Sequence, residues 1–378
     1  MNRIYFDHNA TTALDPSVLE TMVSELRGPP ANPSSTHYFG KKAKAALTRA
    51  RELIASYFSV KPEALIFTSG ATESLNALLR SLFGSRPKGH LVTTALEHSA
   101  VYETVRYLEG TGLSVSFVPV DSWGAPRVEA IEEAIQSDTR AIVLSAANTE
   151  TGVKLDIEAI AALAERRGIP LILDAVAFIG KEPWVMYSGI SALAFSGHKF
   201  HGPKGIGGMV IRPDLKFSPL ITGGGQESLR RSGTEFLAGI LGLARAFEIL
   251  IERQPEITAH LSSLRDHLEK GLLREFSELQ INGEGPRISN TSNLFFPGVD
   301  GETLLMHLDM AGVAASHGSA CSSGALEPSR VLQQMGFPLR RVRSSLRFSL
   351  GRMNTLAEVD ACIERTSEII SKFYTQLV

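Results

Sequence analysis

Lys199 is the residue with the clearest chemical potential in this sequence. It stands in Ala194-Phe-Ser-Gly-His-Lys-Phe-His-Gly-Pro, directly after a short apolar run and among glycines. An amine at the end of a buried strand is partly desolvated, which favours the neutral form that attacks carbonyl groups to make a Schiff base. A glycine-rich turn with an exposed lysine is the alternative, and it is the commoner meaning of such a segment. A phosphate loop is excluded because Pro203 occupies the position of the required lysine.

Asp174 ends the apolar run Ile169-Pro-Leu-Ile-Leu-Asp, one crossover before Lys199. A carboxylate there can keep the pyridine nitrogen of pyridoxal phosphate (PLP) protonated, which makes the ring an electron sink. Taken alone, an aspartate at a strand end is more often a helix cap or a metal ligand. Its position one crossover before Lys199 favours the role of partner to the pyridine nitrogen, because open α/β sheets bind ligands at neighbouring strand ends.

A third segment, Phe67-Thr-Ser-Gly-Ala-Thr-Glu-Ser-Leu, turns from small residues into an apolar-periodic helix. Free backbone N–H groups and the positive end of the helix dipole at Ala71 and Thr72 suit a phosphate group. Judged by itself, the segment favours a plain capped helix over a phosphate site.

The two cysteines have different surroundings. Cys362 lies in a segment whose apolar positions recur at helical spacing, which indicates a core position. Cys321 instead lies among Gly, Ser and Ala residues, which bury little surface and leave the backbone free to move. Two thiols exclude a disulfide framework and a structural zinc site made of thiolates. His198 and His201 have no carboxylate or thiol beside them, so we expect no metal site.

Short β-rich runs alternate with helical stretches from about residue 91 to residue 212. This alternation predicts an α/β domain with a mainly parallel sheet covered on both faces. Ile157–Arg167 is an expected helix, with its charged residues on one side. The expected strands are Leu91–Thr94, Val115–Val120, Ala141–Ser145, Ile169–Asp174, Ala192–Ser196 and Ile206–Ile211.

The rest of the chain predicts a smaller α+β unit. Its expected elements are a helix from about Ile257 to Phe276, strands at Asn293–Phe296 and Ser345–Ser349, and a closing helix from Leu356. A chain of 378 residues has room for two such domains.

Composition excludes several classes of partner. The formal charge is -2, so no strong basic field is present to hold nucleic acid or anionic lipid. The apolar runs are far shorter than the roughly 20 residues that span a bilayer. We therefore expect a cytoplasmic protein with no nucleic-acid or membrane partner.

The motifs occur in the order used by a known family. The chain resembles the class V aminotransferase-like, fold type I PLP enzymes, and within them the NifS/IscS-like cysteine desulfurases. The matching motifs are Tyr5-Phe-Asp-His-Asn-Ala-Thr-Thr, Asn32-Pro-Ser-Ser-Thr-His, Thr68-Ser-Gly-Ala-Thr-Glu-Ser, Glu97-His-Ser-Ala, Asn148-Thr-Glu-Thr-Gly, Ser196-Gly-His-Lys, Arg231-Ser-Gly-Thr, Gly318-Ser-Ala-Cys-Ser-Ser-Gly and Leu346-Arg-Phe-Ser-Leu-Gly.

This resemblance implies the PLP-dependent transferase fold type I, with a seven-stranded type of sheet. Residues 14–255 would form the large PLP-binding domain, and residues 1–13 with 256–378 the small domain that carries the nucleophile loop. The implied catalytic residues are Cys321 as nucleophile, Lys199 as Schiff-base lysine and His98 stacked on the ring. The implied cofactor-binding residues are Ala71, Thr72, His98, Asn148, Asp174, Ser196, Gly197, His198, Lys199 and, from a second subunit, Thr234. Asn148 and Arg347 would bind the substrate carboxylate.

The resemblance implies a homodimer that converts L-cysteine to L-alanine and passes sulfur, as a persulfide on Cys321, to an acceptor. The acceptor would be an iron–sulfur scaffold protein or a tRNA-thiolation relay. Two alternatives are a related lyase acting on selenocysteine or cysteine sulfinate, and a degenerate non-catalytic homologue. The second is prompted by Ala177, because the family usually has a glutamine there that bonds the phenolic oxygen of the cofactor.

Overall fold

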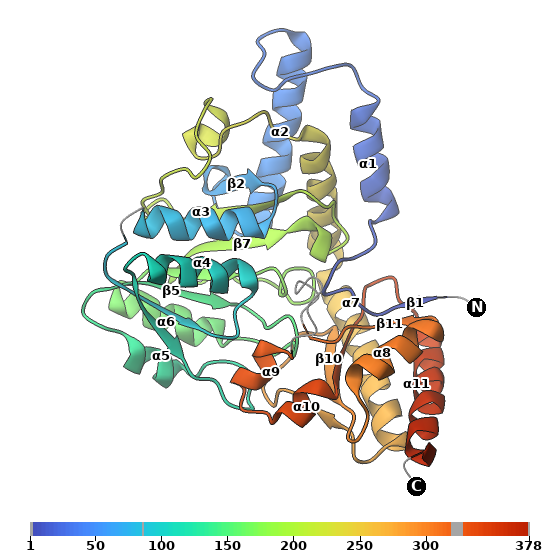
Figure 1. Cartoon of the computed structure of the whole chain (residues 1–378). Helices are drawn as coiled ribbons and strands as arrows, with labels where there is room; N and C mark the ends of the chain where they lie inside the picture. The colour runs from blue at the N-terminus through green and yellow to red at the C-terminus, as the bar shows by residue number, and fades with distance from the viewer. Residues whose placement is uncertain (1–2, 85–86, 319–327, 377–378) are drawn as a thin grey trace.

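The computed structural model describes residues 3–84, 87–318 and 328–376 (Figure 1), and it describes side chains as far as residue 373. Its main feature is a seven-stranded sheet in the order β2-β8-β7-β6-β5-β3-β4, in which β8 runs antiparallel to both of its neighbours. The other pairs are parallel, as the sequence predicts. The strands are β2 (Leu65–Thr68), β3 (His90–Thr94), β4 (Ser114–Val118), β5 (Thr139–Ser145), β6 (Leu171–Asp174), β7 (Ile190–Ser196) and β8 (Gly207–Ile211).

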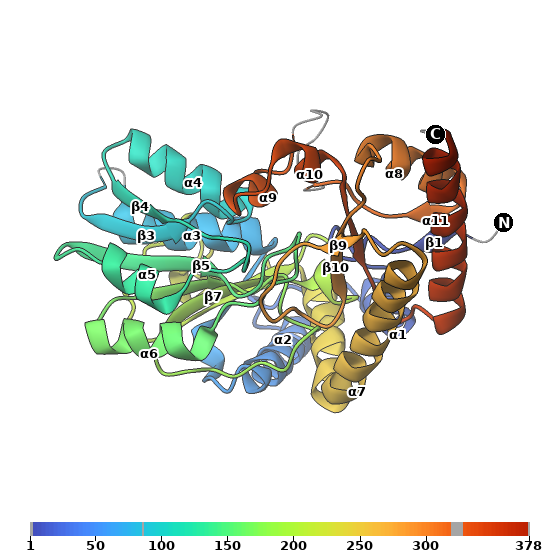
Figure 2. The ribbon, with the colours of Figure 1, turned by 90° about the horizontal axis from the view of Figure 1, so that it is seen from below.

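Successive residues of the central strands point into two separate hydrophobic cores. Leu171 and Leu173 of β6 belong to one core, whereas Ile172 between them belongs to the other. Burial on both faces explains why these strands read as continuous apolar runs. Helices α3 (Ala71–Phe83) and α4 (Ser99–Gly110) cover one face, and α2 (Tyr38–Tyr57), α5 (Val128–Ala134) and α6 (Ile157–Arg167) cover the other (Figures 1 and 2).

Helix α7 (Leu237–Glu275) links the two halves of the molecule (Figure 2). The expected start near Ile257 was wrong by 20 residues, because Pro255 lies inside the helix and breaks the pattern in the sequence. The first half of α7 packs against α1 (Pro16–Leu26) and α2, and these contacts outweigh the local cost of a proline. The boundary expected at residues 255/256 falls within this helix.

The smaller α+β unit is built around the antiparallel sheet β12-β10-β9 and a two-stranded parallel sheet, β1 with β11. Strand β1 brings the N-terminus onto the C-terminal part of the chain, where Ile4 pairs with Val313. The strands are β1 (Ile4–Tyr5), β9 (Gln280–Ile281), β10 (Thr291–Phe295), β11 (Val313–Ala314) and β12 (Ser345–Ser349); the helices are α8 (Gly301–Met310), α9 (Arg330–Gln334), α10 (Leu339–Arg343) and α11 (Leu356–Gln376). Among the described residues, no helix is both long and apolar enough to cross a membrane.

Candidate active site

Five strands of the large sheet lead to the same region, and each is followed by a predicted site residue. Ala71 follows β2, His98 follows β3, Asn148 follows β5, Asp174 ends β6 and Ser196 ends β7. The carboxyl ends of these parallel strands meet at one edge of the sheet, which is where open α/β folds bind ligands. The sheet therefore gathers the predicted cofactor residues from more than 100 positions of sequence.

Asp174 and Lys199 lie within electrostatic range of each other. Asp174 sits on β6 opposite Ala194 of β7, and Lys199 follows in the short 3-10 helix η2 (Gly197–Lys199). The Asp174 side chain is buried, and its Oδ1 accepts a hydrogen bond from Val176 N at 3.0 Å. Burial raises the pKa of Asp174, while the charges of His98 and Lys199 oppose the rise. A further positive charge at this carboxylate would stabilise its ionised form.

The N-terminal segment holds the side chain of Lys199. Its Nζ donates hydrogen bonds to the carbonyl oxygens of Asn9 at 2.5 Å and Ala10 at 3.1 Å. The next residues hold the turn itself, since Thr12 N and Thr12 Oγ1 both donate to His198 O at 2.9 Å. The first dozen residues are thus part of the site, although sequence reasoning gave them no role there beyond a family motif.

A hollow of about 370 Å³ lies at the N-terminus of α3. Ser196 Oγ accepts a hydrogen bond from Ala71 N at 2.8 Å and so joins the end of β7 to the first residue of the helix. The backbone of β8 also lies close to the turn before α3, because a Cβ atom on Gly207 would be 2.8 Å from Gly70 Cα. The lining residues are Thr11, Ser69, Gly70, Ala71, Thr72, Glu73, Ser196, His198, Lys204 and Gly205. A small cavity with helix N–H groups, hydroxyls and a lysine suits a phosphate group.

His98 is the N-cap of α4, and its Nδ1 accepts a hydrogen bond from Ala100 N at 3.1 Å. An accepting Nδ1 places the proton of the neutral ring on Nε2. The preceding residue, Glu97, is buried, and its carboxyl oxygens accept hydrogen bonds from Thr94 Oγ1 at 2.7 Å and Ser145 Oγ at 2.6 Å. Burial raises the pKa of Glu97 to about 7.

Arg347 enters from the three-stranded sheet, on β12. Its Nη2 donates to Asp7 Oδ1 at 2.6 Å and its Nη1 to Thr149 O at 3.2 Å, while its buried Nε has no hydrogen-bond partner in the described structure. A buried guanidinium with an unused donor suits a carboxylate ligand. Asn148, predicted to bind the same carboxylate, uses its Oδ1 for Glu150 N at 2.9 Å and Thr151 N at 3.0 Å.

Three predicted positions are not among these contacts. Cys321 lies outside the described residues. Thr234 is exposed and does not line the phosphate-sized hollow, although Arg231 in the same segment binds Glu73 of α3 at 2.9 Å. Ala177 is buried and offers no side-chain donor where the family has its amide. The roles of all three residues stay predictions.

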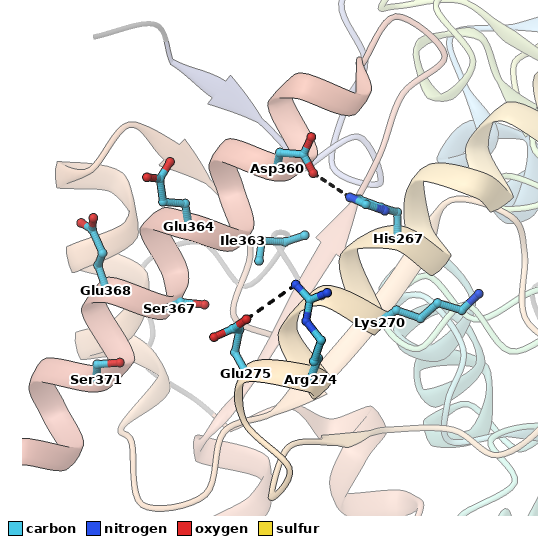
Figure 3. A pocket seen from close by; sticks show the side chains of 11 residues that line it. His267, Lys270, Arg274, Glu275, Asp360, Ile363, Glu364, Ser367, Glu368 and Ser371 are labelled. Carbon is cyan, nitrogen blue, oxygen red and sulfur yellow. Dashed lines mark hydrogen bonds and ion pairs between the residues drawn. The ribbon is translucent and has the colours of Figure 1, made fainter.

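A larger groove between α7 and α11 contains none of the predicted site residues (Figure 3). His267, Lys270 and Arg274 line it from α7, and Asp360 and Glu364 line it from α11. These charges are partly paired, for example His267 Nε2 with Asp360 Oδ1 at 2.6 Å. Within the described ranges, no group of three or more His, Cys, Asp or Glu residues could hold a metal ion.

Comparison with known proteins agrees with this geometry. Residues 4–362 match the family "Aminotransferase class-V". A cysteine desulfurase of Nostoc sp. is 40% identical over 98% of this chain and 94% of its own length. The chain belongs to the cysteine desulfurases of the class-V aminotransferase family. A cysteine desulfurase IscS of Methanosarcina thermophila is also 40% identical, over 98% of this chain and 92% of its own.

Solved structures of related proteins have the same fold. A NifS-like protein superposes with a TM-score of 0.90 at 37% identity, covering 98% of this chain and 100% of its own. The structure of SspA in complex with cysteine gives a TM-score of 0.82 at 31% identity, with 93% and 100% covered. The predicted family and fold class are therefore confirmed.

Members of this family depend on PLP, and the described residues fit that group. The hollow at α3 suits its phosphate, the buried carboxylate of Asp174 suits its ring nitrogen, and Lys199 supplies an amine beside both. This cysteine desulfurase is a PLP enzyme. Sequence reasoning missed Thr11, Lys204 and the carbonyl groups of Asn9 and Ala10, since backbone acceptors and rim residues leave no side-chain pattern to recognise.

Proposed function

We propose that this chain takes sulfur from free L-cysteine, releases L-alanine and carries the sulfur as a persulfide on Cys321. The observation that supports this most directly is the meeting of Lys199 and Asp174 at adjacent strand ends, with Arg347 arriving from the second sheet. The names of the relatives favour a desulfurase over the selenocysteine or cysteine-sulfinate lyases.

When bound, PLP supplies an electron sink that acidifies the Cα–H bond of an amino acid and makes its β-sulfur a leaving group. Asp174 would hold the positive ring nitrogen, and Ala71, Thr72, Ser196, Gly197 and His198 the phosphate. Arg347 and Asn148 would orient the substrate carboxylate, and Lys199 Nζ would take the α-proton once it is free of the cofactor. His98, half-buried at the start of α4, would assist proton transfer from its Nε2.

The sulfur transfer itself falls to Cys321. Its thiolate would attack the substrate sulfur, so that an S–S bond forms while the S–Cβ bond of cysteine breaks, as in thiol–disulfide exchange. The electron pair left on the substrate carbon takes up a proton, and alanine leaves. The persulfide would then pass to an acceptor protein, such as an iron–sulfur scaffold or a tRNA-thiolation relay.

A second copy of the chain would complete the site. Thr234 is exposed and lies outside the phosphate-sized hollow of its own subunit. Exposed apolar side chains also occur in the segment that contains Thr234, a pattern that marks interaction surfaces; they are Leu220, Ile221, Leu229 and Phe236. We further propose a cytoplasmic location, where both cysteines would stay reduced.

The test is to incubate the purified protein with L-cysteine and measure alanine, sulfide and the protein persulfide. Cys321→Ser should stop sulfide and persulfide formation, with Cys362→Ser as the matched control because Cys362 is a buried core thiol. Lys199→Ala should also lose the borohydride-sensitive absorbance band of the cofactor. An unchanged rate in Cys321→Ser would remove the nucleophile from the scheme. Wild-type protein that takes up no PLP would favour the non-catalytic homologue.

A further inference from the structure

A second lysine, Lys181, is buried next to the turn that carries Lys199. It follows the Asp174 strand by seven residues and is only 4% exposed. A lysine is almost never buried to this degree without a paired charge. Within the described part of the chain, however, no ion pair joins Lys181 to a carboxylate.

The only hydrogen bond described for the amine of Lys181 goes to the peptide of Lys199. Lys181 Nζ donates to Lys199 O at 2.5 Å. The backbones are in close contact beside this bond, because Gly180 has φ +81° and a Cβ there would lie 2.4 Å from Phe200 Cβ. Only glycine fits such an approach, so the two turns are held side by side.

The main chain of Lys181 is held by hydrogen bonds from α7 and from Ser289. Its carbonyl oxygen accepts hydrogen bonds from Thr258 Oγ1 of α7 at 2.7 Å and from Ser289 Oγ at 2.8 Å. The neighbouring Glu182 is occupied by Lys154 Nζ at 2.9 Å and Ser289 N at 2.8 Å. Lys181 therefore connects α7 and the Ser289 segment with the turn of Lys199.

The side chain of Lys181 lies among basic groups, and the adjacent carboxylate of Glu182 is engaged by Lys154. His8 comes from the N-terminal segment, His198 and Lys199 from η2, and His201 from the turn that follows. Burial, followed by repulsion from Lys199, lowers the pKa of Lys181 to about 7. Repulsion between two amines acts equally on both, so a proton on Lys181 disfavours a proton at Lys199 Nζ.

We propose that Lys181 is a positioning residue for Lys199, which fixes the turn through the Lys199 carbonyl and makes protonation at Lys199 Nζ less favourable. This inference rests on the proposed function, in which Lys199 must both hold the cofactor and accept a proton. Lys181 itself does not touch the reacting atoms.

The experiment is a spectrophotometric pH titration of the PLP-loaded, full-length protein. The absorbance of the covalent link between Lys199 and PLP changes when its nitrogen takes up a proton, so the midpoint reports the local charge. Lys181→Met removes charge and donor, Lys181→Gln keeps a donor without charge, and Lys181→Arg keeps both. The control is Lys270→Met, an exposed lysine in the groove between α7 and α11 (Figure 3).

The expected result is a midpoint about one pH unit higher in Lys181→Met and Lys181→Gln, which corresponds to about a tenfold change in the protonation constant. Lys270→Met should stay within about 0.3 unit of the wild type. Lys181→Arg should have a midpoint at or below the wild-type value, since its guanidinium keeps a positive charge beside Lys199 at every pH of the titration. A purely structural role would lower the melting temperature of the Met variant and leave its midpoint unchanged, and that outcome overturns the proposal. A Gln variant with the wild-type midpoint overturns it too. Failure of the proposed function would instead show as a wild-type protein with no titrating band.

Discussion

The part of the site on the seven-stranded sheet and the part on the three-stranded sheet hold their charged groups by different means. Asp174 and Lys199 lie at the ends of neighbouring strands of one sheet, so backbone pairing fixes their separation. Arg347 comes from a different sheet, and its guanidinium is aimed by side-chain and carbonyl contacts to Asp7 and Thr149. The half proposed to hold the cofactor is thus built into the fold, whereas the half proposed to hold the substrate depends on an ion pair that a second carboxylate can join or replace.

The largest effect is expected from Asp174→Asn, which keeps the shape of the side chain and removes its charge. Alanine formation should fall about 10²–10³-fold, because one preorganised electrostatic group is lost from the site. The measurement is kcat for alanine together with PLP content from absorbance. Asp156→Asn is the matched control, since Asp156 only caps α6 through Ala159 N. Equal rates in the two variants would contradict the role of Asp174.

Arg347→Lys tests the part of the site that comes from β12, where Arg347 is proposed to bind the substrate carboxylate. Kcat/KM should fall about 10–100-fold, mostly through KM, because an ammonium group cannot reproduce bidentate binding of a carboxylate. PLP content should stay at the wild-type level, since the cofactor residues belong to the other sheet. The exposed Arg340→Lys serves as control. Loss of PLP in Arg347→Lys would show that the two halves are not independent.

The pH dependence of stability should come from the basic residues beside Lys199. Burial lowers the pKa of His8 to about 4 and that of His201 to about 3, whereas an unfolded histidine titrates near 6.5. The unfolded chain therefore binds protons first as the pH falls. The free energy of unfolding is therefore unaffected by these histidines above a pH of about 6.5 and falls toward pH 4. At pH 5 the loss is about 2 kcal/mol per histidine. Glu97 acts with the opposite sign, because its raised pKa of about 7 destabilises the fold most above pH 7.

The corresponding variant is His201→Gln. The drop in the free energy of unfolding between pH 7.5 and pH 5, measured by denaturant titration, should be about 2 kcal/mol smaller than in the wild type. His267→Gln is the control, because His267 is exposed (Figure 3) and a surface ion pair is worth about 0–1 kcal/mol. Identical drops in the wild type and His201→Gln would exclude His201 as a source of the acid sensitivity.

The smallest expected effect concerns Ala177. Introducing the family's amide by Ala177→Gln should tighten PLP binding about fivefold relative to Ala177→Leu, because one hydrogen bond is worth about 1 kcal/mol. The pair of variants matches side-chain volume and differs in the donor. Fluorescence titration of the PLP-free protein measures both affinities. Equal affinities would show that another group already satisfies the cofactor oxygen.

Most of the large sheet could be predicted from the sequence, because buried parallel strands produce continuous apolar runs. Ile157–Arg167 and Ser345–Ser349 were predicted with the observed bounds. The start of α7 was not, since Pro255 argues locally against a helix that tertiary contacts maintain. Lys199 and Asp174 could be proposed as site residues from the sequence, because the chemistry of a side chain follows from its residue type. The support for Lys199 from Asn9 and Ala10 could not, because main-chain carbonyl groups are the same in every residue.

The pairing of Ile4 with Val313 has a consequence for synthesis on the ribosome. The first strand emerges early, yet its partner follows about 300 residues later, which is roughly 15–60 s at ordinary translation speed. During that interval the β1–β11 pair, which anchors the segment preceding Asn9 and Ala10, cannot form. The large sheet can assemble while translation continues, but this anchor beside the Lys199 turn is added only after nearly the whole polypeptide has been made.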